Sequence, residues 1–238
     1  MLNFIVCAIY LIKCRLSLNN MPHSILIKRL LLLTAVFFCS LSALQSQNLR
    51  QVVEAINIDL QRRNFQKVII TGDSVLATLS KDKKADQKLF AFSSFLTGSA
   101  YMETGQLVKA GTLLSDAVEL YRKFDNGSPI FYIACNNLGN FYLQTGQFVS
   151  AVSLLKESLE GSKALSKEYN QNQFPAYMNL ALAYRETGRH KDAVALLHEL
   201  ERNITAGNRE HILLLKSSFV SIFTDIGEFE IAESGIND

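Results

Sequence analysis

The stretch FYLQTGQFVSAV, residues 141–152, has close copies upstream in AYMETGQLVKAG (100–111) and downstream in AYRETGRHKDAV (183–194). A tyrosine precedes the glycine of each stretch by four residues and an alanine follows it by five, at Tyr101, Tyr142 and Tyr184 and at Ala110, Ala151 and Ala193. The glycines themselves, Gly105, Gly146 and Gly188, recur at a nearly constant spacing of about 41 residues, and a fixed period of this size indicates a stacked array of repeated units.

Each unit is predicted to be a pair of antiparallel helices. The glycine stands just past the first helix, where the chain needs a left-handed residue to turn back. The alanine marks the point where the second helix crosses the first, because a larger side chain would push the two backbones apart. Apolar residues between 107 and 121 recur with the spacing of one buried helix face, and no segment alternates as a strand does. We therefore expect an all-helical fold.

Weaker copies of the unit are predicted at both ends of the array. Downstream, the sequence DIGEFEIAES and the residues after it keep the same offsets, with Phe223, Gly227, Ala232 and Ile236. Stepping upstream from Gly105 by the interval that separates it from Gly146 reaches Asn64, with Leu60 at the tyrosine position and Ile69 at the alanine position. Asparagine tolerates the left-handed conformation better than most residues. These patterns predict a degenerate repeat at about 50–83 and a partial repeat at about 213–238.

Residues 91–124, 132–165 and 174–207 resemble tetratricopeptide repeats. Besides the tyrosines, glycines and alanines above, the matching residues are Gly98, Leu114, Ala117, Leu138, Gly139, Leu155, Leu180, Ala181 and Leu197. The resemblance implies a right-handed superhelix of helix hairpins. The period is longer than that of the standard repeat, which takes about 34 residues. In this respect the repeats are similar to those of kinesin light chain and of some bacterial sensory regions.

In this family the groove lined by the first helices usually holds a peptide. The resemblance assigns to that groove Phe95, Ser99, Met102 and Glu103, then Asn136, Asn137, Asn140 and Gln144, and then Asn179, Leu182, Arg185 and Glu186. The amides suit hydrogen bonding to an extended backbone; the alternative is that these are solvated polar residues on exposed helix faces. Asn136 and Ser217 stand where the family's clamp for a terminal carboxylate has cations, so we expect no such clamp.

No catalytic or nucleic-acid signature occurs in the sequence. It has no phosphate-binding loop, no dinucleotide fingerprint and no HExxH pair. His190, His198 and His211 share no metal-ligand spacing, and Cys135 occupies a position that is usually buried. The formal charge is +2 overall, and the four cations of residues 1–46 leave the remainder at +2 − 4 = −2, so nucleic-acid binding is not expected. We expect neither an enzyme nor a cofactor.

Residues 1–46 are predicted to be a signal peptide or an amino-terminal membrane anchor. Lys28 and Arg29 precede an apolar run, Leu30–Phe38, which small residues follow. Met21 is a candidate for the true start, and the rival interpretation is an uncleaved anchor. The domain organisation predicted is therefore 1–46 as signal or anchor and 47–238 as the helical array, exported to the periplasm or the cell exterior or held at the inner membrane.

The function expected is non-catalytic binding of a protein or an extended peptide by an exported scaffold. Contact with a membrane is expected only through the amino-terminal segment. The alternative is a truncated input domain of a bacterial membrane histidine kinase or helix-turn-helix regulator. The sequence ends inside the second helix of the partial repeat, and arrays of this kind usually need a polar cap. We therefore expect either a continuation of the chain or packing of this end on a partner or a second copy.

Overall fold

The computed structural model describes residues 34, 36, 47–81, 86–165, 173–203, 209–229 and 231. The chain divides into two units, Met1–Val52 and Val53–Asp238. In the first unit the described residues are 34, 36 and 47–52, all helical, and the predicted signal or anchor lies outside them apart from residues 34 and 36. No helix within the described ranges is long and apolar enough to cross a membrane.

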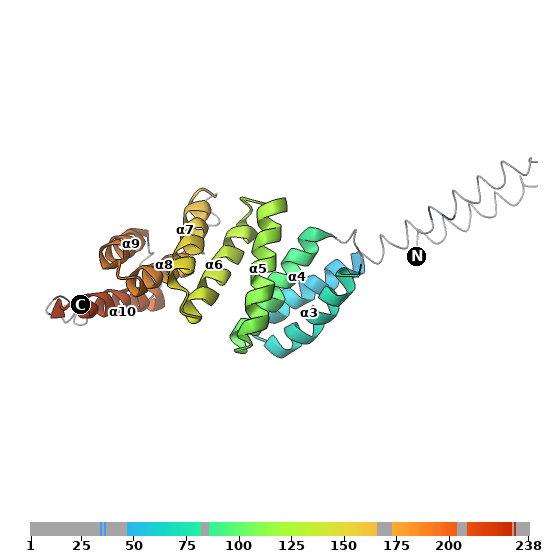
Figure 1. Cartoon of the computed structure of the whole chain (residues 1–238), viewed down its shortest axis with the longest axis horizontal. Helices are drawn as coiled ribbons and strands as arrows, with labels where there is room; N and C mark the ends of the chain where they lie inside the picture. The colour runs from blue at the N-terminus through green and yellow to red at the C-terminus, as the bar shows by residue number, and fades with distance from the viewer. Residues whose placement is uncertain are drawn as a thin grey trace, which may run out of the picture. The chain divides into compact units, whose positions relative to one another are not determined.

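The second unit is built from helices throughout its described part, as the sequence predicts. Helical residues 53–61 are followed by α3 Phe65–Leu79, α4 Gln87–Glu103, α5 Leu107–Phe124, α6 Pro129–Gln144, α7 Phe148–Lys163, α8 Phe174–Glu186, α9 His190–Asn203 and α10 Arg209–Asp225. Each of α3 to α9 packs against the next helix in the chain (Figure 1). The array is therefore a row of hairpins whose first helices are residues 53–61, α4, α6, α8 and α10.

The Thr-Gly pair of the repeated stretch forms the turn of each hairpin. Thr104 ends α4 and its hydroxyl donates to the carbonyls of Ala100 and Tyr101; Thr145 and Thr187 do the same in their repeats. The glycines that follow have φ angles of 74°, 73° and 72°. The N–H of Gly105 donates to Met102 and that of Gln106 donates to Tyr101, the paired bonds that close a helix with a left-handed residue.

The turn of the degenerate first repeat lies one residue earlier than predicted. Arg63 has a φ of 59°, whereas Asn64 has a φ of −80° and precedes α3 directly. The N–H of Arg63 donates to Leu60 and that of Asn64 donates to Asp59, which reproduces the bond pattern at Gly105. The prediction that Asn64 takes the glycine position is therefore wrong. The interval from Arg63 to Gly105 equals the interval from Gly146 to Gly188, whereas the prediction used the shorter interval from Gly105 to Gly146. With this register Asp59 replaces the tyrosine, and Val68 replaces the alanine.

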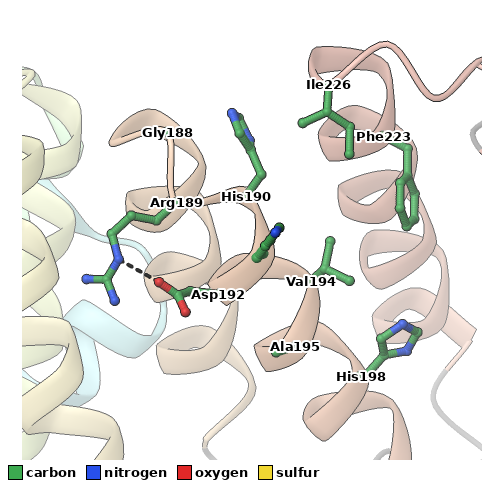
Figure 2. Close-up of a pocket in the computed structure, with 10 residues that line it drawn as sticks. Gly188, Arg189, His190, Asp192, Val194, Ala195, His198, Phe223 and Ile226 are labelled. Atoms are coloured by element: carbon green, nitrogen blue, oxygen red, sulfur yellow. Dashed lines mark hydrogen bonds and ion pairs between the residues drawn. The ribbon is translucent and has the colours of Figure 1, made fainter.

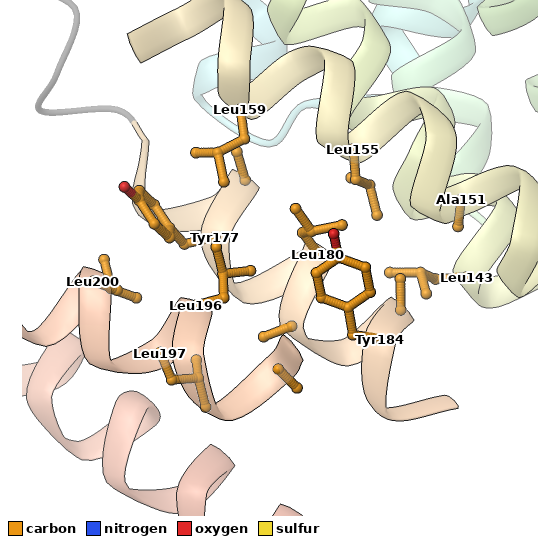
Figure 3. Packing of buried hydrophobic residues seen from close by; sticks show 14 of the residues in the cluster. Leu143, Ala151, Leu155, Leu159, Tyr177, Leu180, Tyr184, Leu196, Leu197 and Leu200 are labelled. Atoms are coloured by element: carbon orange, nitrogen blue, oxygen red, sulfur yellow. The ribbon is translucent and has the colours of Figure 1, made fainter. Parts of the chain in front are cut away.

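Small residues bring the two helices of a hairpin close together. Ala110, Ala151 and Ala193 are fully buried near the start of each second helix. A methyl group added at Gly139 of α6 would lie 2.6 Å from Cγ and Cδ2 of Leu155 on α7. Around this contact a continuous apolar cluster joins α6 to α10, with the leucines of α7 and α9 facing the tyrosines of α8 (Figure 3). The core thus runs through successive repeats without a break.

Capping residues start two of the first helices. The carboxylate of Asp86 accepts from the N–H groups of Lys88 and Leu89 at the start of α4. The hydroxyl of Ser128 accepts from Phe131 at the start of α6, where Pro129 occupies the first turn. Side-chain oxygens at these positions satisfy N–H groups that the helix itself leaves unpaired. Both first helices therefore start at positions specified by local sequence.

Candidate functional site

Short polar side chains join neighbouring first helices. Asn137 of α6 donates to the hydroxyl of Ser99 on α4 at 3.0 Å, and Asn179 of α8 donates to the amide oxygen of Asn136 on α6 at 3.1 Å. The helices in contact are α4 with α6, α6 with α8, and α8 with α10. We call the surface made by α4, α6, α8 and α10 the inner face.

Longer side chains join the second helices. Arg122 of α5 donates to both carboxylate oxygens of Glu157 on α7, at 2.6 and 2.7 Å. Lys163 of α7 lies 2.6 Å from the carboxylate of Glu199 on α9. An amide and a hydroxyl span a smaller gap than a guanidinium or ammonium paired with a glutamate. The first helices therefore lie closer together than the second helices, and the array curves with the inner face on its concave side.

Three residues of α4 that the resemblance assigns to the groove are buried. Phe95, Ser99 and Met102 have exposed fractions of 6%, 5% and 7%. Helix α4 packs against α3 and α5 as well as α6, so its middle has almost no free surface. The expectation that these residues line an open groove is wrong. The hydroxyl of buried Ser99 accepts the hydrogen bond from Asn137. Glu103, in contrast, is exposed and lies 3.5 Å from Arg63.

The amides of α6 form the accessible part of the inner face. Asn136, Asn137 and Asn140 are partly exposed and Gln144 is exposed. Asn136 uses its amide oxygen and Asn137 its amide nitrogen in the bonds to neighbouring helices. Among the described residues, the amide nitrogen of Asn136, the amide oxygen of Asn137 and the whole amides of Asn140 and Gln144 remain without a side-chain partner. Free donors and acceptors therefore follow α6 along its length.

One group of paired charges on the inner face lies at the far end of α8. Arg185 donates to the carboxylate of Asp225 on α10 and lies 3.7 Å from Glu186. Leu182, one turn earlier, is 39% exposed. Helix α6 itself contains no Asp, Glu, Lys, Arg or His. The centre of the inner face is therefore neutral, and its neighbours on α8 pair their charges with one another.

A cavity of 310 Å³ opens between the start of α6, the end of α7 and the start of α8. Asn136 and Asn137 line it together with Ile133, which is 41% exposed. The other lining residues are Pro129, Tyr132, Ser158, Ser162, Leu165, Gln173, Pro175 and Ala176. No lining side chain within the described ranges is charged at neutral pH, and the volume is at the lower end of the range for ligand pockets. Sequence reasoning missed this cavity because its walls come from three helices.

A second cavity of 810 Å³ lies between α9 and α10 (Figure 2). Val194, Phe223 and Ile226 form its apolar part, and Arg189, which donates to Asp192 at 2.7 Å, lies at one side. In the preceding repeat, Tyr184 occupies the position of Phe223 and is buried. Phe223, in contrast, is only half-buried. The prediction that this end packs on a partner or second copy remains a prediction.

Two buried tyrosines, Tyr101 and Tyr177, each connect a first helix to the two second helices that flank it. Tyr101 donates to Asp73 at 2.6 Å and accepts from Lys109 at 3.1 Å. Tyr177 donates to Glu199 at 2.7 Å, and the ammonium of Lys163 lies 5.0 Å from its ring centre. Burial, with the hydrogen bond to the carboxylate, raises the pKa of both phenols. These bonds hold α3–α5 and α7–α9 together.

The remaining reactive side chains do not form a cluster. Cys135 is fully buried, and burial raises the pKa of its thiol to about 12, so it remains an unreactive part of the core. His211 stacks on Phe174 with ring centres 3.7 Å apart, and His198 lies beside Phe219. Within the described ranges, no three His, Cys, Asp or Glu side chains come together as a metal site.

Residues 132–202 match the model of the tetratricopeptide repeat family. Within these residues the chain carries tetratricopeptide repeats. Such repeats commonly bind proteins or peptides and are generally non-catalytic scaffolds. No protein of curated function matches the sequence.

Several solved structures share this tetratricopeptide fold. A crystal structure of putative kinesin light chain repeats from Podosopora anserina is 19% identical, covers 81% of this chain and 93% of its own, and has a TM-score of 0.68. BtubC (BKLC) from P. vanneervenii is 19% identical over 79% of this chain and 76% of its own, with a TM-score of 0.65. The MamA RS-1 ArsTM double mutant is 14% identical over 79% and 90%, with a TM-score of 0.55. At these identities the likeness concerns the fold alone.

Proposed function

We propose that the chain is a non-catalytic scaffold that binds a protein or an extended peptide on its inner face. The observation that carries the proposal is the set of free amide donors and acceptors along α6, because unpaired backbone-like groups on a neutral concave surface match those of a peptide backbone. On α8, the pairing of Arg185 with Asp225 and Glu186 leaves that guanidinium unavailable to a terminal carboxylate. We therefore expect the ligand to be bound through its backbone along α6 and not through a terminal carboxylate at Arg185.

Site-specific photocrosslinking in living cells tests this proposal. A photoreactive phenylalanine analogue at Asn140 places the crosslinker on the inner face, and the same analogue at Val149, 80% exposed on α7, is the matched control on a second helix. We expect discrete protein adducts from Asn140 and none of the same mass from Val149. Identical adduct patterns from both positions would contradict binding on the inner face.

We also propose that residues 1–46 direct export of the array or tether it to the membrane. The pattern of Lys28 and Arg29 before an apolar run and small residues supports this proposal. Mass spectrometry of the chain purified from its host compartment tests it. A mature amino terminus near residue 47 indicates a cleaved signal, whereas an intact amino terminus in the membrane fraction indicates an anchor. An intact chain in the cytosolic fraction would contradict both.

A further inference from the structure

We propose that the cavity between α6, α7 and α8 receives one uncharged aliphatic or aromatic side chain of an extended peptide whose backbone lies along α6. This inference rests on the proposed function and names the class of peptide that the inner face selects. Its basis is the position of the cavity, which shares Asn136 and Asn137 with the row of amides. The anchor side chain and the backbone contacts would thus meet at the same two residues.

The chemistry of the cavity excludes a charged occupant. Its apolar wall includes Ile133, Leu165 and Pro175, and none of the described residues that line it carries a charge at neutral pH. A charged side chain placed there would lose its hydration without gaining an ionic partner, which is strongly unfavourable. The polar groups present are amides and hydroxyls. Ser158 already donates to the carbonyl of Tyr132 at 2.7 Å, and Ser162 to that of Leu159 at 3.0 Å.

The two asparagines at the cavity present complementary groups. Asn136 accepts from Asn179 and has its amide nitrogen free, whereas Asn137 donates to Ser99 and has its amide oxygen free. The pair therefore offers one donor and one acceptor at the cavity, with Asn136 bonded toward α8 and Asn137 toward α4. A peptide unit needs the same pair in reverse, an acceptor for its N–H and a donor for its carbonyl. The residue anchored in the cavity would use both.

The spacing of the amides on α6 indicates that the peptide lies parallel to the helix axis. Asn136, Asn140 and Gln144 are four residues apart, and four residues of helix rise by about 6 Å. Residues two apart in an extended chain are separated by about 6.6 Å. Alternate residues of an extended peptide lying along α6 therefore come opposite successive amides. A peptide crossing α6 at right angles would meet one amide only.

A library of capped nonapeptides tests the anchor. The central residue is fixed as each amino acid in turn, the other positions are mixtures, and both ends are blocked so that no terminal charge contributes. The full chain, held in mild detergent, is expected to retain the libraries with central Leu, Ile, Met or Phe most strongly. Those with Asp, Glu, Lys or Arg should be retained least.

Two variants show whether the cavity makes the choice. Ile133→Glu places a carboxylate in the cavity wall at a position exposed enough to tolerate it, and Val149→Glu makes the same kind of change on α7 outside the cavity. We expect Ile133→Glu to lose retention of the Leu library by about tenfold and to gain retention of the Lys and Arg libraries. Val149→Glu should select as the wild type does, and circular dichroism should show both variants folded.

A third variant tests the backbone contact. Asn140→Ala removes a free amide of α6 that does not line the cavity, so it should weaken retention of all libraries without changing their order. If the wild type selects a charged central residue, or if Ile133→Glu selects as the wild type does, the cavity is not the anchor site while peptide binding stands. If the wild type retains no library, both the anchor and the proposed peptide binding are overturned.

Discussion

Gly139→Ala tests how closely the two helices of the second full repeat approach each other. Alanine in a helix interior is favoured over glycine by about 1 kcal/mol. At Gly139 the new Cβ would lie 2.6 Å from two carbon atoms of Leu155, about 1 Å closer than carbon atoms normally approach. Leu155 is fully buried, so the overlap requires the helices to separate or the leucine to leave its rotamer. Overpacking of this kind costs about 1–3 kcal/mol.

The net expectation for Gly139→Ala is a loss of about 1 kcal/mol in the free energy of unfolding. Urea denaturation followed by circular dichroism at 222 nm measures it, and the same substitution in a Leu155→Ala background isolates the cause. Leu155→Ala removes Cγ, Cδ1 and Cδ2, the atoms nearest to the new Cβ, so Gly139→Ala should then be neutral or stabilising. An equal loss in both backgrounds would refute contact with Leu155 as the reason.

Four other expectations follow from single residues. Ala151→Leu should lower the thermal midpoint of the array by overpacking a fully buried position, with a loss of about 1–3 kcal/mol, and an unchanged melting curve by circular dichroism would place the helix crossing elsewhere. Arg63→Gly should raise the free energy of unfolding by about 1 kcal/mol in urea titrations, because it relieves a left-handed conformation at the cost of exposed contacts only. With Cys7, Cys14 and Cys39 replaced by serine, Cys135 should react with Ellman's reagent only after addition of denaturant. Reaction in the native protein at pH 8 would contradict its burial. Burial opposes ionisation of Glu199, but hydrogen bonds from Lys163 and Tyr177 hold the pKa of its carboxyl below the ordinary value of 4.5. The contribution of Glu199 to stability is therefore present above that pH and is lost in acid, so the stabilities of the wild type and Glu199→Gln should converge as the pH falls. A constant difference down to pH 2 would contradict this.

The hairpins could be predicted because turn chemistry is local. A glycine with a positive φ and a threonine that bonds to the last helical turn are required at each bend, so the same letters recur at Gly105, Gly146 and Gly188. The turn of the first repeat was predicted one residue too late, at Asn64, because the period does not fix its position to a single residue. The two intervals between these glycines differ by one, so either Arg63 or Asn64 fits the period, and residue preference favoured asparagine. The backbone hydrogen bonds place the left-handed residue at Arg63.

The inner face was predictable only in part because a position in the repeat does not fix what covers it. Ser99 and Asn140 hold the same place relative to their glycines, yet Ser99 is buried and Asn140 is partly exposed. Serine is the shorter side chain, and Asn137 of the next first helix lies against its hydroxyl. The cavity could not be predicted at all, since Ile133, Leu165 and Gln173 come from separate parts of the chain that meet only when two repeats stack.

The links between repeats also bear on how the inner face would respond to a ligand. Asn137 and Asn179 join neighbouring first helices through short side chains with few rotatable bonds, whereas Arg122 and Lys163 join second helices through long and partly exposed ones. A change of curvature must alter the gaps on both sides. Long side chains can follow such a change by rotation, but the short hydrogen bonds made by Asn137 and Asn179 on the inner face would break. The spacing of α6 against α4 and α8 is therefore the better defined of the two, and a peptide lying along α6 meets a surface already set before it binds.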